Sequence, residues 1–181
     1  FAIHFADIKE KISQQQKEGF IRQLLECGIK MQDLLKDEAI KPIKSIAKSL
    51  SKSKDALYIG RGLSYVTALE SALKLREISY INAHGIAAGE LKHGTIALID
   101  KKMPVIVVAP RNESSELFEK TLSNAAEVNA RGGKLIVLSD KTGVSRFAKY
   151  SKKAIITGNI SGIIEEALLP IISMQLLAYY V

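Results

Sequence analysis

The stretch Asp-Ala-Leu-Tyr-Ile-Gly-Arg-Gly-Leu-Ser-Tyr at residues 55–65 contains the most informative pattern in the chain. Its apolar run at residues 56–59 ends in Gly60-Arg61-Gly62, and a long helical pattern follows from about Tyr65 to Ile81. Apolar runs without polar alternation are typical of strands that are buried on both faces. The stretch therefore predicts a buried strand, a tight turn and a helix, which together form the opening unit of an α/β fold.

The same unit recurs along the chain. Residues 104–110, 134–139 and 154–157 have the pattern of buried strands, and we expect helices from about Ser114 to Arg131 and from about Ile163 to Tyr180. This alternation predicts an α/β fold of three αβα layers, with a doubly wound, mostly parallel sheet of the flavodoxin-like type. We expect residues 55–181 to form this domain.

Residues 1–54 are expected to form a helical arm or connector. Apolar positions within residues 6–36 recur at a spacing nearer to the helical period than to strict alternation. Pro42 suits the first turn of a further helix that runs to about Ser53.

The composition excludes several classes of protein. The 181 residues fit one domain with an extension. The net charge of +7 is spread among alternating acids and bases, so nucleic-acid binding is not expected. A single cysteine, Cys27, allows no internal disulfide and fits a reducing, cytoplasmic setting. No apolar run reaches the roughly 20 residues that cross a bilayer, so no membrane contact is expected.

Gly60-Arg61-Gly62 is the first candidate binding element. It lies between a strand and a helix, at the carboxyl edge of the expected sheet, where ligands of open α/β folds bind. The turn suits an anion, but Tyr65 stands where a Gly-x-Gly-x-x-Gly motif needs its third glycine, so a nucleotide site is not expected. The alternative is that the two glycines simply allow a tight strand-to-helix turn.

Glu70, Lys74 and Glu77 form the second candidate, because spacings of four and three place them on one helix face. One interpretation is a solvated face with an ordinary Glu–Lys pair. The other is a carboxylate held near a cation, which keeps a proton-transfer base ionised and oriented.

The segment at residues 83–100 contains two of the three histidines. His84, Glu90 and His93 have side chains that can bind a metal, but nothing in the sequence fixes their directions. We therefore predict neither a metal site nor a cofactor. A histidine in a glycine-bounded turn can equally be structural.

Three stretches together resemble the second sugar isomerase (SIS) domain of the glucosamine-6-phosphate synthases. They are Leu57-Tyr58-Ile59-Gly60-Arg61-Gly62, Ala68-Leu69-Glu70-Ser71-Ala72-Leu73-Lys74-Leu75-Arg76-Glu77-Ile78-Ser79-Tyr80 and Ala87-Ala88-Gly89-Glu90-Leu91-Lys92-His93-Gly94. Gln175-Leu176-Leu177-Ala178-Tyr179 matches as well, so the resemblance covers about residues 55–181.

The resemblance implies an enzyme that makes glucosamine 6-phosphate from fructose 6-phosphate and ammonia derived from glutamine. Glu77 matches the carboxylate that moves a proton between C1 and C2, and Lys74 matches a cation that stabilises the enolate-like charge. His93 matches the ring-opening histidine, which in this family reaches into the site of the partner subunit, and Glu70 matches a supporting acid. We expect a homodimer that binds a sugar phosphate, with further binding or supporting residues at Gly60, Arg61, Gly62 and Glu90.

The chain also departs from this family. Thr95 stands where proline usually follows Lys-His-Gly. Because the sequence starts at Phe1 and stops at Val181 within a helical pattern, we expect a piece of a longer enzyme. The glutaminase domain, the first SIS domain with its phosphate-binding loop and the tail with the Schiff-base lysine are expected to be its partners.

The isolated chain is therefore expected to be inactive. The alternatives are a free-standing SIS-type domain that binds a phosphosugar for regulation, and a scaffold for a dimer interface.

Overall fold

A computed structural model of the chain describes residues 1–110 and 115–181. Within these residues, five parallel strands form one sheet in the order β2-β1-β3-β4-β5. The strands are β1 (Asp55–Gly60), β2 (Asn82–Ala87), β3 (Pro104–Val108), β4 (Lys134–Ser139) and β5 (Ala154–Ile156). Strand β2 lies on one side of β1, and the next strand along the chain, β3, lies on the other side. The carboxyl ends of β1 and β3 therefore form the topological switch point.

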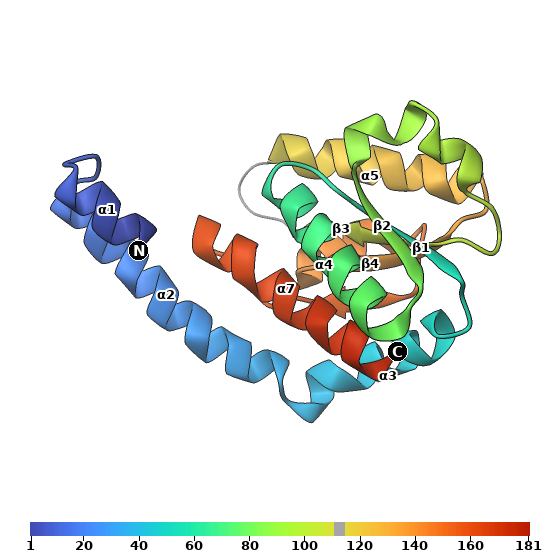
Figure 1. The fold of residues 1–181 in the computed structure, drawn as a ribbon, viewed down its shortest axis with the longest axis horizontal. Coiled ribbons are helices and arrows are strands. Elements are labelled where there is room, and N and C mark those ends of the chain that lie inside the picture. Colours follow the sequence, from blue (N-terminus) through green and yellow to red (C-terminus); the bar gives the residue numbers. More distant parts are fainter. Residues whose placement is uncertain (111–114) are drawn as a thin grey trace.

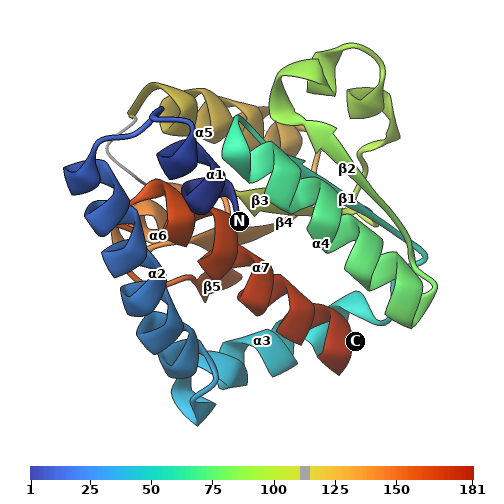
Figure 2. The ribbon, with the colours of Figure 1, turned by 60° about the vertical axis from the view of Figure 1, so that its left-hand side comes forward.

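Helices cover both faces of the sheet, as Figures 1 and 2 show. On one face, Tyr58, Ile106 and Leu138 pack in a single buried cluster with α3 (Asp37–Leu50), α4 (Leu63–Ser79) and α7 (Ile163–Tyr180). On the other face, Ile59 and Val107 pack with α5 (Ser115–Ala130), α6 (Lys141–Phe147) and the 3₁₀ helix η1 (Ala88–Lys92). The predicted three-layer, doubly wound fold is confirmed.

The amino-terminal helices extend from this body along α7 (Figure 1). They are α1 (Ala2–Ile8) and α2 (Gln14–Leu34), and α2 begins with a capping box between Ser13 and Gln16. Cys27 and Leu34 of α2 are buried together with Leu169 of α7. The described part of this segment is therefore helical and docks on the domain.

The predicted start of the third helical segment and several missed elements need correction or comment. Pro42 does not lie in a first turn, because α3 already begins at Asp37. Proline has no N–H to donate to the backbone carbonyl of Glu38, four residues earlier. Because Glu38 is exposed, solvent can hydrogen-bond to that carbonyl instead. The sequence analysis missed strand β2, the short helix α6 and a second 3₁₀ helix, η2 (Thr95–Leu98). The predicted first residue of α5, Ser114, lies outside the described residues.

Helix α7 is the one helix in the described residues with the length and composition of a membrane span, with a mean hydropathy of 1.3. In this fold one face of α7 packs in the core, and 39% of the helix is buried. Leu169, Leu177 and Ala178 are fully buried, and α7 packs between α2, α3 and α4.

Candidate active site

The carboxyl-terminal half of α4 brings Glu70, Lys74 and Glu77 together, as the spacing predicts. The ammonium of Lys74 lies 2.8 Å from Oε2 of Glu77 and 3.7 Å from Oε1 of Glu70. The hydrogen bond with Glu77 raises the pKa of Lys74 above its ordinary value. The Glu77 side chain remains 49% exposed, so its carboxylate is accessible to a ligand.

The surroundings of this cluster differ from those of a solvated helix face. Val66, Leu69 and Ile78 of α4 are exposed by 56%, 42% and 53%, respectively. Apolar side chains next to an accessible, cation-paired carboxylate are typical of a site that another protein surface completes.

The Gly60-Arg61-Gly62 turn has the predicted place between β1 and α4. A Cβ at Gly60 would overlap the backbone carbonyl of Ser64, and Gly62 caps α4 with a φ of 54°. The guanidinium of Arg61 donates to Oδ1 of Asn124 on α5, with Nη2 at 2.9 Å. Arg61 is therefore engaged in holding two elements together.

Glu90 and His93 lie on the turn that follows β2, and both are exposed. Glu90 belongs to η1, and His93 is the residue that ends it.

His84, in β2, instead shares a hydrogen bond of 2.8 Å with Oδ1 of Asn82. Among the described residues, no group of three or more His, Cys, Asp or Glu side chains could hold a metal ion. Thr95, the departure from the family pattern, opens η2 directly after Gly94.

The predicted site residues separate into two groups, one at the carboxyl ends of the strands and one near their amino-terminal ends. Helix α4 begins at the carboxyl edge after Gly62 and ends at Ser79, beside the amino-terminal end of β2. Fourteen residues of helix separate Leu63 from Glu77, which is about 20 Å at 1.5 Å per residue. The turn with His93 follows the carboxyl end of β2 and packs on the face opposite to α4. One chain therefore does not bring His93 to Glu77.

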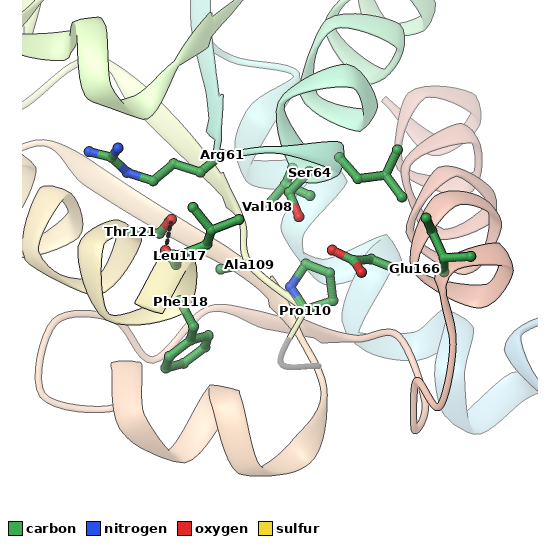
Figure 3. A pocket seen from close by; sticks show the side chains of 11 residues that line it. Arg61, Ser64, Val108, Ala109, Pro110, Leu117, Phe118, Thr121 and Glu166 are labelled. Carbon is green, nitrogen blue, oxygen red and sulfur yellow. Dashed lines mark hydrogen bonds between the residues drawn. The ribbon is translucent and has the colours of Figure 1, made fainter. Parts of the chain in front are cut away.

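A cavity of about 220 Å³ lies at the switch point, next to the turn of Arg61 (Figure 3). Ser64 and Thr121 line it, and Glu166 of α7 faces them across it. Arg61 extends along the side away from Glu166 in this view. The cavity occupies the place where open α/β folds bind ligands, but it borders a carboxylate as well as the arginine.

Three further residues support this end of the strands and were not predicted from the sequence: Asn124, Glu127 and Lys92. Oε1 of Glu127 accepts from Lys92 at 2.9 Å, and Asn124 is only 5% exposed. A signal for Asn124 exists, because it stands on the apolar face of α5 between the buried residues Thr121 and Val128. Its partner Arg61 is 63 positions away in sequence, and no local pattern predicts that contact.

Comparison with known proteins shows which family this chain resembles. The SIS domain family model matches residues 49–181. The glutamine–fructose-6-phosphate aminotransferase [isomerizing] of Mesorhizobium japonicum is 47% identical over 171 residues, which is 93% of this chain and 27% of the relative. The enzyme of the same name from Zymomonas mobilis is 43% identical over 180 residues, 99% of this chain and 29% of the relative. The chain thus spans less than a third of the length of these relatives.

Solved structures agree with this assignment. The C-terminal domain of the glucosamine-fructose-6-phosphate aminotransferase from Francisella tularensis superposes with a TM-score of 0.83 at 37% identity, covering 98% of this chain and 48% of that one. The sugar isomerase domain of an RpiR transcription factor from Sphaerobacter thermophilus shares the fold, with a TM-score of 0.69 at 17% identity over 88% of both chains. The chain belongs to the SIS domain family, and its sequence matches the isomerase portion of the glutamine–fructose-6-phosphate aminotransferases.

Proposed function

We propose that this chain is the second SIS domain of a glutamine–fructose-6-phosphate aminotransferase (isomerizing). The observation that carries the proposal is the accessible carboxylate of Glu77, held 2.8 Å from the ammonium of Lys74 on a helix face with exposed apolar neighbours. Such a carboxylate is ionised and can accept a proton next to a carbonyl or imine, then return it to the neighbouring carbon. This transfer converts an aminated fructose 6-phosphate into glucosamine 6-phosphate.

The neighbours of Glu77 have supporting roles in this mechanism. Lys74 stabilises the negative charge that develops on the substrate oxygen as the proton leaves carbon. Glu70 lies 3.7 Å from the same ammonium and helps to hold Lys74 in place. His93 opens the sugar ring, and the turn containing Gly60, Arg61 and Gly62 supports the edge from which His93 projects.

The active site requires parts that this chain does not bring together. His93 and Glu77 lie at opposite ends of the strands. In a homodimer, His93 of one copy therefore enters the active site that contains Glu77 of the second copy. The exposed apolar side chains beside Glu77 then pack against another domain of the full-length enzyme. That domain also supplies the groups that bind the sugar phosphate. The glutaminase domain supplies ammonia.

The test replaces the matching 171-residue segment of the Mesorhizobium japonicum relative with this chain and measures formation of glucosamine 6-phosphate. Glu77→Gln is expected to lower the rate at least about 100-fold, because the amide cannot take up the proton. The thermal transition should stay unchanged. Glu116→Gln is the matched control, because Glu116 also forms an exposed ion pair with a lysine on its own helix. A Glu77→Gln enzyme with a near-normal rate would contradict the proposal.

The cavity at the switch point favours a second candidate, a free-standing domain that binds a phosphosugar without catalysis. Calorimetry of the isolated chain with fructose 6-phosphate distinguishes the two. An incomplete catalytic module should bind weakly and show no isomerisation. Tight binding without turnover, unchanged in the full-length chimaera, would favour the second candidate.

A further inference from the structure

Two motifs that are separate in the sequence form one structural unit at the carboxyl edge of the sheet. The first is the Gly60-Arg61-Gly62 turn, and the second is the turn of residues 89–94 that contains His93. Asn124 of α5 joins them. Its Oδ1 accepts from Nη2 of Arg61 at 2.9 Å and from Nε at 3.3 Å.

Arg61 also makes direct contact with the second motif. A Cβ at Gly89 would lie 3.2 Å from Nη1 of Arg61, so the guanidinium rests on the bare backbone of the turn. A side chain at position 89 would require the guanidinium to shift by a few tenths of an ångström.

A second path connects α5 to the same turn. Nδ2 of Asn124 donates to Oε2 of Glu127 at 3.4 Å, and the other carboxylate oxygen of Glu127 binds the ammonium of Lys92 at 2.9 Å. Lys92 is the last residue of η1, and His93 follows it directly. The buried Leu91 anchors the turn between these contacts.

His93 itself has no such anchor. Its side chain is exposed, and within the described residues no hydrogen bond holds its imidazole. The direction in which the ring projects therefore depends on the backbone of the turn, which the contacts from α5 hold.

We propose that Arg61, Asn124 and Glu127 are positioning residues for His93. The inference rests on the ring-opening role of His93 in the proposed function. The three residues fix the turn of residues 89–94 on α5, so that the imidazole reaches the site of a second copy in a constant orientation.

A positioning role differs from a purely stabilising one. The Lys92 side chain is 64% exposed, and an ion pair of that kind contributes little to stability. Misplacing a catalytic group by about 1 Å can nevertheless cost roughly 100-fold in rate. Variants of this network should therefore lower the rate while leaving the fold in place.

The first measurement uses the isolated chain and does not depend on enzyme activity. The amide of His93 donates to the carbonyl of Glu90 at 3.0 Å. In Asn124→Ala, hydrogen exchange at this amide should become about tenfold faster or more, as the turn opens locally. Asn129→Ala, on an exposed position of the same helix, is the matched control and should leave the exchange rate unchanged. Unchanged exchange in Asn124→Ala would overturn the proposal.

The second measurement is a double-mutant cycle in the full-length chimaera. Asn124→Ala should lower kcat about tenfold or more with little change in KM, and it should have no further effect in a His93→Asn background. An equal loss in that background would show a general structural role and overturn the inference. Glu127→Ala repeats the cycle at a partly exposed position, in case Asn124→Ala does not fold. If His93→Asn alone leaves kcat unchanged, the proposed role of His93 fails, and the inference fails with it.

Discussion

Gly60 is a residue at which the fold tolerates no side chain, because a Cβ would overlap the backbone of Ser64 at the start of α4. Gly60→Ala is expected to lower the free energy of unfolding by about 2–3 kcal/mol, since neither backbone can move away without separating β1 from α4. Gly19→Ala is the matched control. It lies within α2 with open space around it and should raise stability by up to about 1 kcal/mol. Urea denaturation of both variants checks the prediction, and similar effects of the two substitutions would contradict it.

Tyr58 is fully buried, and its hydroxyl has no hydrogen-bond partner among the described residues. Burial raises the pKa of this phenol well above its ordinary range. Tyr58→Phe removes an unpaired polar group and keeps the shape, so it should raise the free energy of unfolding by about 1 kcal/mol. Tyr80→Phe, at a position 89% exposed, should change it by less than about 0.5 kcal/mol. Thermal unfolding measures both, and a loss of stability in Tyr58→Phe would indicate a bound partner for the hydroxyl.

Residues that interact within one helix were predictable, and residues that interact across elements were not. The contacts between Glu70, Lys74 and Glu77 follow from helical spacing alone and are confirmed. The bond between Arg61 and Asn124 depends on how α5 packs beside the turn after β1, which local spacing does not encode.

Among the elements, those with strong apolar patterns were predicted best. Strand β4 and helix α7 have the expected bounds, and β1 extends one residue further at each end. Strand β2 lies at one edge of the sheet and pairs only with β1, and its sequence gives a weak strand signal. Its sequence, Asn-Ala-His-Gly-Ile-Ala, leaves most of its side chains partly exposed and lacks the β-branched run of a central strand.

The contact between α2 and α7 includes a partly buried ion pair. Nζ of Lys30 lies 2.5 Å from Oε1 of Glu165, whose side chain is fully buried and also accepts from Ser161. Burial alone would raise the pKa of Glu165, but the bonds from Lys30 and Ser161 outweigh it and hold that pKa below its ordinary value. A lowered pKa in the folded state means that the ionised pair stabilises the fold above the ordinary value of 4.5. That contribution is lost as the pH falls through the lowered pKa.

Lys30→Met should therefore lower the free energy of unfolding at pH 7 by about 3 kcal/mol, because it leaves a buried carboxylate without its cation. The variant should also lose less stability than the parent chain below pH 4.5, since the lost pair no longer contributes. Lys36→Met breaks an ion pair with Asp33 in which both side chains are more than 60% exposed, and it should have little effect. Denaturant titrations between pH 3 and pH 7 check these outcomes. Parallel pH curves for Lys30→Met and the parent would contradict the assignment.

At the scale of the whole molecule, one copy of this chain keeps the two proposed catalytic residues, Glu77 and His93, apart. Helix α4 crosses the full height of the sheet, so the turn at its start and the Glu77 cluster near its end lie about 20 Å apart. The turn of His93 packs with α5 on the opposite face. No movement of the exposed His93 side chain spans that separation, and a second copy is needed if both residues act on one sugar.

Co-expression of two inactive variants of the full-length chimaera tests this arrangement. If each site takes Glu77 from one subunit and His93 from the other, mixed dimers of Glu77→Gln and His93→Asn contain one intact site and one doubly substituted site. Random pairing makes half of the dimers mixed, so about a quarter of the parental activity should return. Sites built within one subunit would contain a substitution in every copy and stay inactive. Activity that returns on mixing, together with inactive homodimers of each variant, would therefore establish that the two edges of this sheet serve different active sites.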